Sequence, residues 1–433
     1  MIKAANIVSV AGRRVWDSRG RPTVEAEVAL TDGSVGCAIA PAGASRGSNE
    51  AIDLRDGGRA FGGLGVAKAL VSIADEIAPS LVGMAADDQA AVDARLIGLD
   101  GTAQKSRLGG NATIAVSMAV AHAAAASARL PLWKYLAAGG RPRIPMPMIQ
   151  IFGGGAHASR RIDVQDILLM PVGATSFDEA TAMVAEVYRA GGELMSEKGL
   201  LRGVADEGGW WPEFGSNEEA LDRAVQAIER AGFRPGDEVA LALDVAASEF
   251  GRGGRYRLAA DGIDLDTAGL IDKLIGWSKT YPIVSLEDPV AEDDDAGMKA
   301  ITGKLGSATQ LVGDDYLVTS AERVRQAVGQ GACNALLVKP NQVGTLTEAK
   351  AALDAAHAAG WRTVVSARSG ETEDVTIVHL AVGWGAHQLK VGSFARSERM
   401  AKWNEAIRVE EALGPDAVFA GRNAVGGSGT PLP

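Results

Sequence analysis

The sequence predicts an α/β protein, with a C-terminal (β/α)8-type barrel and an N-terminal α+β domain. Four short apolar runs between residues 239 and 339 each end on a charged residue, which is typical of buried parallel strands. From residue 141 onward, such runs alternate with helical patterns, as in a strand–helix barrel. Before residue 141, strand patterns come first and helical patterns follow, which indicates an α+β arrangement.

The N-terminal domain is expected to span residues 1–140. An alternating segment over residues 23–30 and a Thr-Asp-Gly-Ser turn at 31–34 predict a hairpin that follows a first strand, all within residues 5–40. Apolar residues at three- and four-residue spacing over residues 66–136 predict helices. Strands are therefore expected first, with helices packed on them.

The barrel domain is expected to span residues 141–433, because a proline-rich hinge at 141–147 separates the two patterns. The glycine- and proline-rich end at 421–433 predicts a loosely held tail. Glycines 232 and 360 predict helix ends. Four capping boxes predict helix starts in this half, and they begin at Ser176, Ser216, Thr319 and Thr345.

Composition excludes several classes of function. The 433 residues carry 43 lysines and arginines against 54 acids, a net charge of −11, which argues against partners such as nucleic acid or an anionic membrane surface. No apolar run approaches the roughly 20 residues of a membrane span, and the first residues lack a signal-peptide layout, so a cytoplasmic location is expected. Cys37 and Cys333 lie in strand-like contexts and are expected to be small core residues.

Three carboxylates end successive strand-like runs: Asp244, Glu287 and Asp314. Strand ends meet at one rim of a barrel, and clustered carboxylates suit a hard divalent cation such as magnesium. Lys339 ends the next run and Lys390 ends another. Burial at the rim is expected to lower the pKa of Lys339, which would make it a usable base.

Two polar clusters complete the candidate chemistry. Asp206–Gly209 places two acids before paired glycines, which allow close backbone approach to a ligand. Glu207 in this turn could donate or accept a proton. Arg368 and Ser369 follow a strand and offer a planar fork and a hydroxyl, which suit a phosphate.

Eight segments resemble signatures of the enolases, in the same order and over almost the whole chain. They are Asp17–Thr23, Gly43–Ser45, Asp206–Gly209, Ser285–Pro289, Gly313–Asp315, Lys339–Gln342, Arg368–Asp374 and Arg396–Arg399. The resemblance implies the enolase kind of barrel with its capping N-terminal domain. It also implies a glycolytic hydro-lyase (phosphopyruvate hydratase) that dehydrates 2-phosphoglycerate, a small phosphorylated acid, to phosphoenolpyruvate. Homodimers or homo-octamers are expected.

The resemblance further implies two Mg²⁺ ions per site. Asp244, Glu287 and Asp314 would hold the first, and a mobile loop through Ser45 would close over substrate and reach the second. Lys339 would remove the proton next to the substrate carboxylate, in line with the Lys or His base and Mg²⁺ ions that are general to this superfamily. The metal ions and positioned cations would stabilise the charge that develops.

The remaining roles also follow from the resemblance. Glu207 would help hydroxide leave as water, and Asp166 stands at the catalytic position where the family has glutamate. The substrate-binding residues would be Lys390 at the carboxylate, Arg368 and Ser369 at the phosphate, and Gln165 and His157 along the pocket.

Four positions depart from the family pattern at or beside the expected pocket. Asp166 lacks one methylene, which withdraws the carboxylate by about 1.5 Å, and errors near 1 Å can cost about a hundredfold in rate. Ala367 replaces a histidine, Ala42 a serine and Gly153 an asparagine. Trp211 stands where a small residue is usual, and we expect it to reshape the volume that Ala367 opens, or else to pack outward.

These departures leave three functions open. The first is the ordinary reaction of 2-phosphoglycerate, favoured by the intact metal and base set. The second is an enolase-like enzyme of specialised phosphonate metabolism, such as carboxyphosphonoenolpyruvate synthase, favoured by changes confined to the pocket. The third is a non-catalytic enolase-like binding protein, disfavoured because decay should also have reached the metal ligands.

Overall fold

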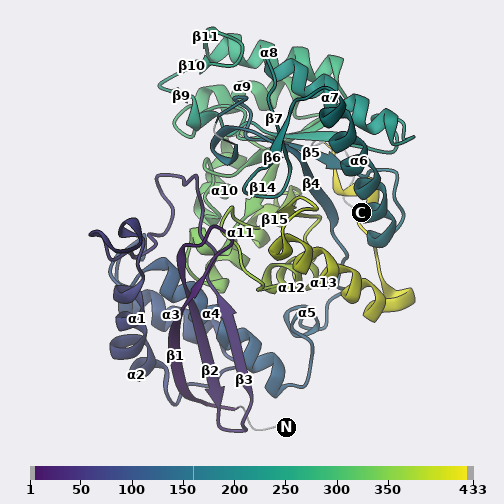
Figure 1. Ribbon diagram of the computed structural model, residues 1–433. Coiled ribbons are helices and arrows are strands. Elements are labelled where there is room, and N and C mark those ends of the chain that lie inside the picture. Colours follow the sequence, from purple (N-terminus) through teal and green to yellow (C-terminus); the bar gives the residue numbers. More distant parts are fainter. Residues whose placement is uncertain (1–4, 159, 427–433) are drawn as a thin grey trace.

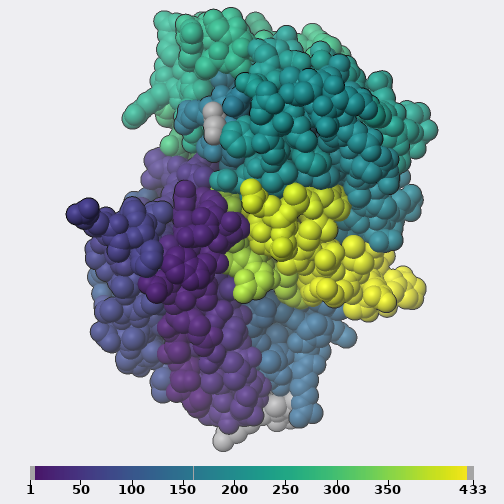
Figure 2. All heavy atoms as spheres, in the orientation of Figure 1, coloured from purple at the N-terminus to yellow at the C-terminus, as the bar shows by residue number. Residues whose placement is uncertain are grey.

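The computed structural model describes residues 5–158 and 160–426. Figure 1 shows a barrel packed on a smaller domain built by the first part of the chain, and Figure 2 shows the two in close contact. The predicted fold class is confirmed: an α+β domain precedes a closed eight-stranded barrel. Among the described residues, no helix combines the length and apolar character needed to cross a bilayer.

The N-terminal domain is an antiparallel sheet covered by helices, with strand order β1-β2-β3. Along β2, Val24, Ala26, Val28 and Leu30 are buried and alternate with more exposed residues, which is the pattern of a sheet with one face on the core. The elements are β1 (Ile7–Trp16), β2 (Pro22–Leu30), β3 (Val35–Ile39), η1 (Ala60–Gly63), α1 (Ala67–Ser72), η2 (Ile73–Ile77), α2 (Ala78–Leu81), α3 (Gln89–Asp100), α4 (Gly110–Ser127) and α5 (Leu132–Leu136).

Helix α4 joins the two parts of the molecule. It contacts β2 and β3 on one side and the barrel elements η5 (Pro340–Gln342) and α11 (Leu346–Ala358) on another. Its many alanines are small, so it lies close to the sheet: a Cβ added to Gly36 of β3 would lie 2.2 Å from Ala123 N. Gly36 is therefore required by helix–sheet contact.

Two glycine-to-alanine changes are expected to have opposite effects on stability. Gly36→Ala is expected to lower the free energy of unfolding by about 1–3 kcal/mol, because backbone must move to admit the methyl group. Gly98→Ala in α3 has open space around it and is expected to raise it by about 0.5–1 kcal/mol through helix propensity. Urea unfolding measures both, and a neutral Gly36→Ala would contradict the close packing.

The barrel strands follow the order β4-β5-β8-β12-β13-β14-β15-β16, and β16 pairs with β4 to close the ring. A hairpin of β6 and β7 extends from β4, and β9, β10 and β11 form a separate small sheet. The strands are β4 (Met146–Gly153), β5 (Asp166–Met170), β6 (Leu201–Val204), β7 (Trp210–Pro212), β8 (Ala240–Asp244), β9 (Gly251–Arg252), β10 (Arg255–Leu258), β11 (Ile263–Asp266), β12 (Ile283–Glu287), β13 (Gln310–Gly313), β14 (Ala335–Val338), β15 (Arg362–Ser366) and β16 (Gln388–Gly392).

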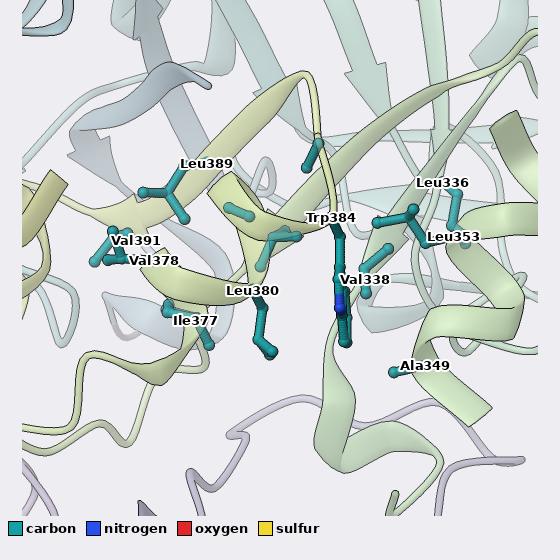
Figure 3. Packing of buried hydrophobic residues seen from close by; sticks show 14 of the residues in the cluster. Leu336, Val338, Ala349, Leu353, Ile377, Val378, Leu380, Trp384, Leu389 and Val391 are labelled. Atoms are coloured by element: carbon teal, nitrogen blue, oxygen red, sulfur yellow. The ribbon is translucent and has the colours of Figure 1, made fainter. Parts of the chain in front are cut away.

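Helices cover the outside of the barrel (Figure 1). Figure 3 shows part of the buried layer beneath them, with Leu353 of α11 beside Leu336 of β14, and Val378 of α12 beside Val391 of β16. The remaining helices are η3 (Gly155–His157), α6 (Phe177–Glu197), α7 (Asn217–Arg230), η4 (Ala247–Glu249), α8 (Thr267–Thr280), α9 (Asp295–Leu305), α10 (Ala321–Gln330), α12 (Thr376–Gly383), α13 (Ser397–Leu413), η6 (Gly414–Asp416) and η7 (Gly421–Ala424).

Strand β5 runs antiparallel to both of its neighbours, β4 and β8. A parallel neighbour needs a long crossover, usually a helix, but in the segment that joins β4 and β5 the described residues form only one short helix, η3. The start of β5 therefore lies where its neighbours end, and Asp166 is the register partner of Asp244. This reversal brings Asp166 to the rim that carries the strand-end carboxylates.

The predicted helix starts are confirmed at Ser176, Ser216 and Thr345, whose side chains accept the expected backbone N–H. The start at Thr319 is wrong by one residue, because Ser320 caps α10. Thr319 is fully buried, and its hydroxyl accepts the backbone N–H of Lys339 at 2.9 Å. Thr319, which the sequence predicts as a helix cap, therefore positions the backbone of Lys339 in the candidate site.

Two expectations about packing are wrong. Ala420, Ala424 and Val425 are buried in a second hydrophobic cluster with barrel-lining methionines, so the start of the expected loose tail fills the barrel end opposite the strand-end carboxylates. Residues 427–433 of that tail lie outside the described residues. Cys37 is exposed and only Cys333 is buried, because residue 37 points to the outer face of β3.

Candidate functional site

A small cavity lies between the barrel rim and the N-terminal loop of residues 41–48; its non-atom space, the open mouth included, is about 280 Å³. All the predicted site residues except Glu287 and Asp314 line it. Those two are ion-paired to Lys390 and Lys339, which do line it. The structure therefore brings the predicted set together in one place.

The carboxylates of Asp244 and Glu287 lie side by side at the ends of β8 and β12, where the two residues are register partners. The Lys390 ammonium donates to both, at 2.8 Å from Asp244 Oδ2 and 2.8 Å from Glu287 Oε1. Burial raises the pKa of Glu287 well above its usual range, and Asp244 adds to this effect. Burial also opposes the charge of Asp244, but Lys390 lowers the pKa of that carboxyl.

Asp314 follows β13 and accepts a hydrogen bond from the Lys339 ammonium. Burial disfavours the charge of Lys339, but the nearby carboxylates of Asp314 and Glu287 together outweigh burial and raise the pKa of Lys339 above its ordinary value. The expected lowering of this pKa is therefore wrong for this arrangement. The sequence pattern does not show the Asp314 carboxylate that contacts this amine.

Two further acids, Asp288 and Asp315, belong to this region. Asp288 accepts the backbone N–H groups of Asp314 and Asp315 at 2.9 and 2.7 Å, and ligand atoms of these three acids lie within 4.8 Å of one another. Burial and the neighbouring Asp314 raise the pKa of Asp288 to about 8. Neither residue was predicted to belong to the site, although each directly follows a predicted metal ligand in the sequence.

Arg368 and Ser369 lie against the N-terminal loop. Arg368 is ion-paired with buried Glu50 at 2.9 Å and donates to the Ser45 carbonyl at 2.9 Å. Ser369 Oγ accepts the Ala44 N–H at 2.7 Å. The loop that carries Ser45 is therefore docked over the cavity. Burial opposes the charge of Arg368, but Glu50 reverses this effect and raises its pKa.

His157, Asp166 and Glu207 form the opposite side of the cavity. His157 Nδ1 lies 3.0 Å from Asp166 Oδ1, and His157 Nε2 lies 3.8 Å from Glu207 Oε1. Burial disfavours the charged imidazole, but Asp166 and Glu207 raise the pKa of His157 to about 9. The turn that holds Glu207 needs glycine next in the chain, because Gly208 has φ +92° and an added Cβ would lie 2.2 Å from the Ala395 carbonyl oxygen.

The departures from the family pattern lie either at the cavity or behind it. Ala367 lines the cavity, and Ala42 pairs through its backbone with Gly370 beside it. Gly153 lies behind Asp166, as its register partner on β4. Trp211 is absent from the described residues that line the cavity and lies near the guanidinium of Arg161, 5.9 Å from its ring centroid. Trp211 therefore does not line the pocket, contrary to the expectation that it reshapes the volume beside Ala367.

Comparison with protein families agrees with this geometry. Residues 7–136 match the enolase N-terminal domain, and residues 142–427 match the enolase C-terminal TIM barrel domain. Enolases are lyases that usually depend on a metal, and the carboxylate clusters at the rim agree with that property. Because the two matches cover nearly the whole chain, the protein belongs to the enolase family.

Proposed function

We propose that the protein is a magnesium-dependent lyase that dehydrates 2-phosphoglycerate to phosphoenolpyruvate. The observation that carries this proposal is the pairing of two buried lysines with three buried carboxylates at the barrel rim. One lysine can act as a base, while the other keeps a positive charge at a fixed position beside it. Such preorganisation is what the removal of a weakly acidic proton requires.

The donor set fits divalent magnesium. Asp244, Glu287 and Asp314 offer only oxygen ligands. Burial and, after it, the like charge of Asp244 raise the pKa of Glu287, and a bound cation would relieve the repulsion between these carboxylates. These residues would hold one ion, and the loop through Ser45 would reach a second. When bound, Mg²⁺ would stabilise the additional negative charge on the substrate carboxylate.

Side chains of the protein would carry out proton removal and substrate binding. Lys339 accepts the proton next to the substrate carboxylate, and Lys390 binds that carboxylate. Lys339 can do this only in its neutral form. The Asp314 carboxylate raises the pKa of Lys339, so Asp314 would have to bind the cation instead of the lysine. Arg368 and Ser369 bind the phosphate, and the Glu207 side of the cavity receives the departing hydroxide.

An assay in deuterated water tests the proposal. With 2-phosphoglycerate and Mg²⁺, we expect both deuterium exchange at the α-carbon, followed by NMR, and release of phosphoenolpyruvate. Removing divalent cations with a chelator should abolish both, and adding Mg²⁺ back should restore them, because the carboxylates alone cannot stabilise added negative charge. If neither exchange nor release occurs with Mg²⁺ present, the proposal is wrong.

A second candidate is a related reaction of a phosphonylated acid in specialised metabolism, as catalysed by carboxyphosphonoenolpyruvate synthase. Ala367 favours it, because this small residue lines the cavity where the family has an imidazole, and it leaves room for a different leaving group. The same exchange assay separates the candidates. Faster exchange and elimination with a phosphonylated acid than with 2-phosphoglycerate would favour the second.

A further inference from the structure

The turn of residues 17–21 lies against the loop of residues 367–371, which follows β15. The backbone N–H of Ser18 donates to the Glu371 carbonyl at 2.7 Å. Arg19 extends from this turn, and its side chain is only 8% exposed. Arg19 is not among the described residues that line the cavity, so its influence on a bound substrate has to pass through its neighbours.

The Arg19 guanidinium bridges two segments at the cavity. Its Nη2 donates to the Ala42 carbonyl at 2.8 Å, and its Nη1 donates to Ser369 Oγ at 3.3 Å. Asp17 fixes the guanidinium from another side through an ion pair of 3.2 Å. Because the planar fork presents several donors at once, one side chain connects the N-terminal loop of residues 41–48 to the candidate phosphate-binding serine.

Both acceptor positions of the Ser369 hydroxyl are occupied. Ser369 Oγ accepts the Ala44 N–H at 2.7 Å and the Arg19 Nη1–H at 3.3 Å. A serine hydroxyl has two acceptor lone pairs and one O–H donor, so the O–H remains for a further partner. Ser369 lines the cavity. Its hydroxyl is therefore set to donate to a group that accepts, such as an ionised phosphoryl oxygen.

The position of Arg19 requires a glycine beside Ser369. A Cβ added to Gly370 would lie 2.3 Å from Arg19 Nη2 and 2.5 Å from Asp17 Oδ2. The backbone N–H groups of Gly370 and Ala42 each donate to the carbonyl of the other residue at 2.9 Å. The chain therefore packs closely around the guanidinium, and a methyl group at position 370 would displace it without removing its charge.

We propose that Arg19 is a positioning residue that couples docking of the N-terminal loop of residues 41–48 to phosphate binding. It holds the loop through the Ala42 carbonyl and orients the Ser369 hydroxyl as a donor. The inference rests on the proposed function and deepens it, because it concerns the phosphoryl end of the same site. A docked loop and a bound phosphoryl group stabilise each other, since both depend on one guanidinium.

Affinity for inorganic phosphate, measured by ³¹P NMR titration in the presence of Mg²⁺, tests the phosphate half of this coupling. Arg19→Lys keeps the positive charge but loses the planar fork, and it should weaken binding about tenfold. Ser369→Ala should weaken binding by a similar factor. Because both changes act on one hydroxyl, the double variant Arg19→Lys/Ser369→Ala should bind no more than about twofold more weakly than the weaker single variant.

Two results of this titration would overturn the proposal. If the wild-type protein does not bind inorganic phosphate, the Ser369 hydroxyl is not set to receive it. If the effects of Arg19→Lys and Ser369→Ala multiply in the double variant, Arg19 acts on phosphate independently of the hydroxyl.

Hydrogen–deuterium exchange without any ligand tests the loop half. The amides of Ala42 and Ala44 are hydrogen-bonded to residues 370 and 369. Gly370→Ala displaces Arg19 and should raise the exchange rate of peptides from residues 41–48 about tenfold. Inorganic phosphate should slow this exchange in the wild type but not in Arg19→Lys. Equal exchange rates in the wild type and both variants would overturn the coupling.

Matched controls make the same changes at exposed positions. Arg95→Lys on α3 and Gly276→Ala on α8, where an added Cβ meets open space, should leave phosphate affinity and loop exchange unchanged. Neither measurement needs turnover, so the inference and the proposed function can fail separately. A wild type that shows the expected coupling but does not convert 2-phosphoglycerate would reject only that substrate. Turnover with unaltered phosphate affinity and loop exchange in Arg19→Lys would reject only the coupling.

Discussion

Replacing Lys339 by arginine is expected to abolish α-proton exchange, with a loss of about 10⁴-fold. Arginine keeps the positive charge beside Asp314, so the buried carboxylate stays paired, but its guanidinium does not lose a proton near neutral pH. The loss therefore reports base catalysis, whose contribution reaches about 10⁴-fold. Exchange of the α-proton of 2-phosphoglycerate in deuterated water measures it directly.

A matched control is available for this prediction. Lys299 on α9 is exposed, and Lys299→Arg should leave exchange and unfolding unchanged. Thermal unfolding of Lys339→Arg should also stay close to that of wild type, because the ion pair is retained. Exchange at the wild-type rate in folded Lys339→Arg would remove Lys339 as the base.

The second large effect is expected in stability. Arg368→Met removes the partner of Glu50 within a pair whose side chains are only 3% and 4% exposed. An uncompensated buried charge typically costs about 3–5 kcal/mol, so the free energy of unfolding should fall by that amount. Chemical denaturation at neutral pH measures the loss, and Glu50→Gln/Arg368→Met should recover part of it, because no charge is then left unpaired.

A surface ion pair serves as the reference for this change. Arg189 and Glu193 on α6 form a 2.6 Å pair whose side chains are 57% and 45% exposed. Solvent screens such a pair, so Arg189→Met should not shift the unfolding transition measurably. If Arg368→Met also left the unfolding transition unchanged, the guanidinium would not be buried against Glu50 as it is in the structure.

Strand-end residues were predictable because their geometry follows from chain direction alone. Asp244 and Glu287 end neighbouring parallel strands, so their proximity needs no knowledge of side-chain packing. The same logic gave Lys339 and Lys390 their places at the rim. Short apolar runs that stop on charged residues therefore carry enough information to locate the centre of this site.

The rest of the site depends on contacts between distant segments. Nothing in the sequence indicates that Glu50 would pair with Arg368, or that Gln150 would reach both Asp166 and Gly209. The direction of the Lys339 pKa was missed for the same reason, since its sign depends on the balance between burial and the neighbouring carboxylates of Asp314 and Glu287. Such effects depend on placement at the ångström scale, which residue patterns do not contain.

The reversed direction of β5 has a consequence for how such a site can change over time. The carboxylates of Asp244 and Glu287 are carried by strands that end at the rim, whereas Asp166 is carried by a strand that begins there. Changes in the connection between β4 and β5 can thus move Asp166 without displacing the carboxylates of Asp244 and Glu287. One wall of the pocket can therefore vary in sequence while the neighbouring wall stays unchanged.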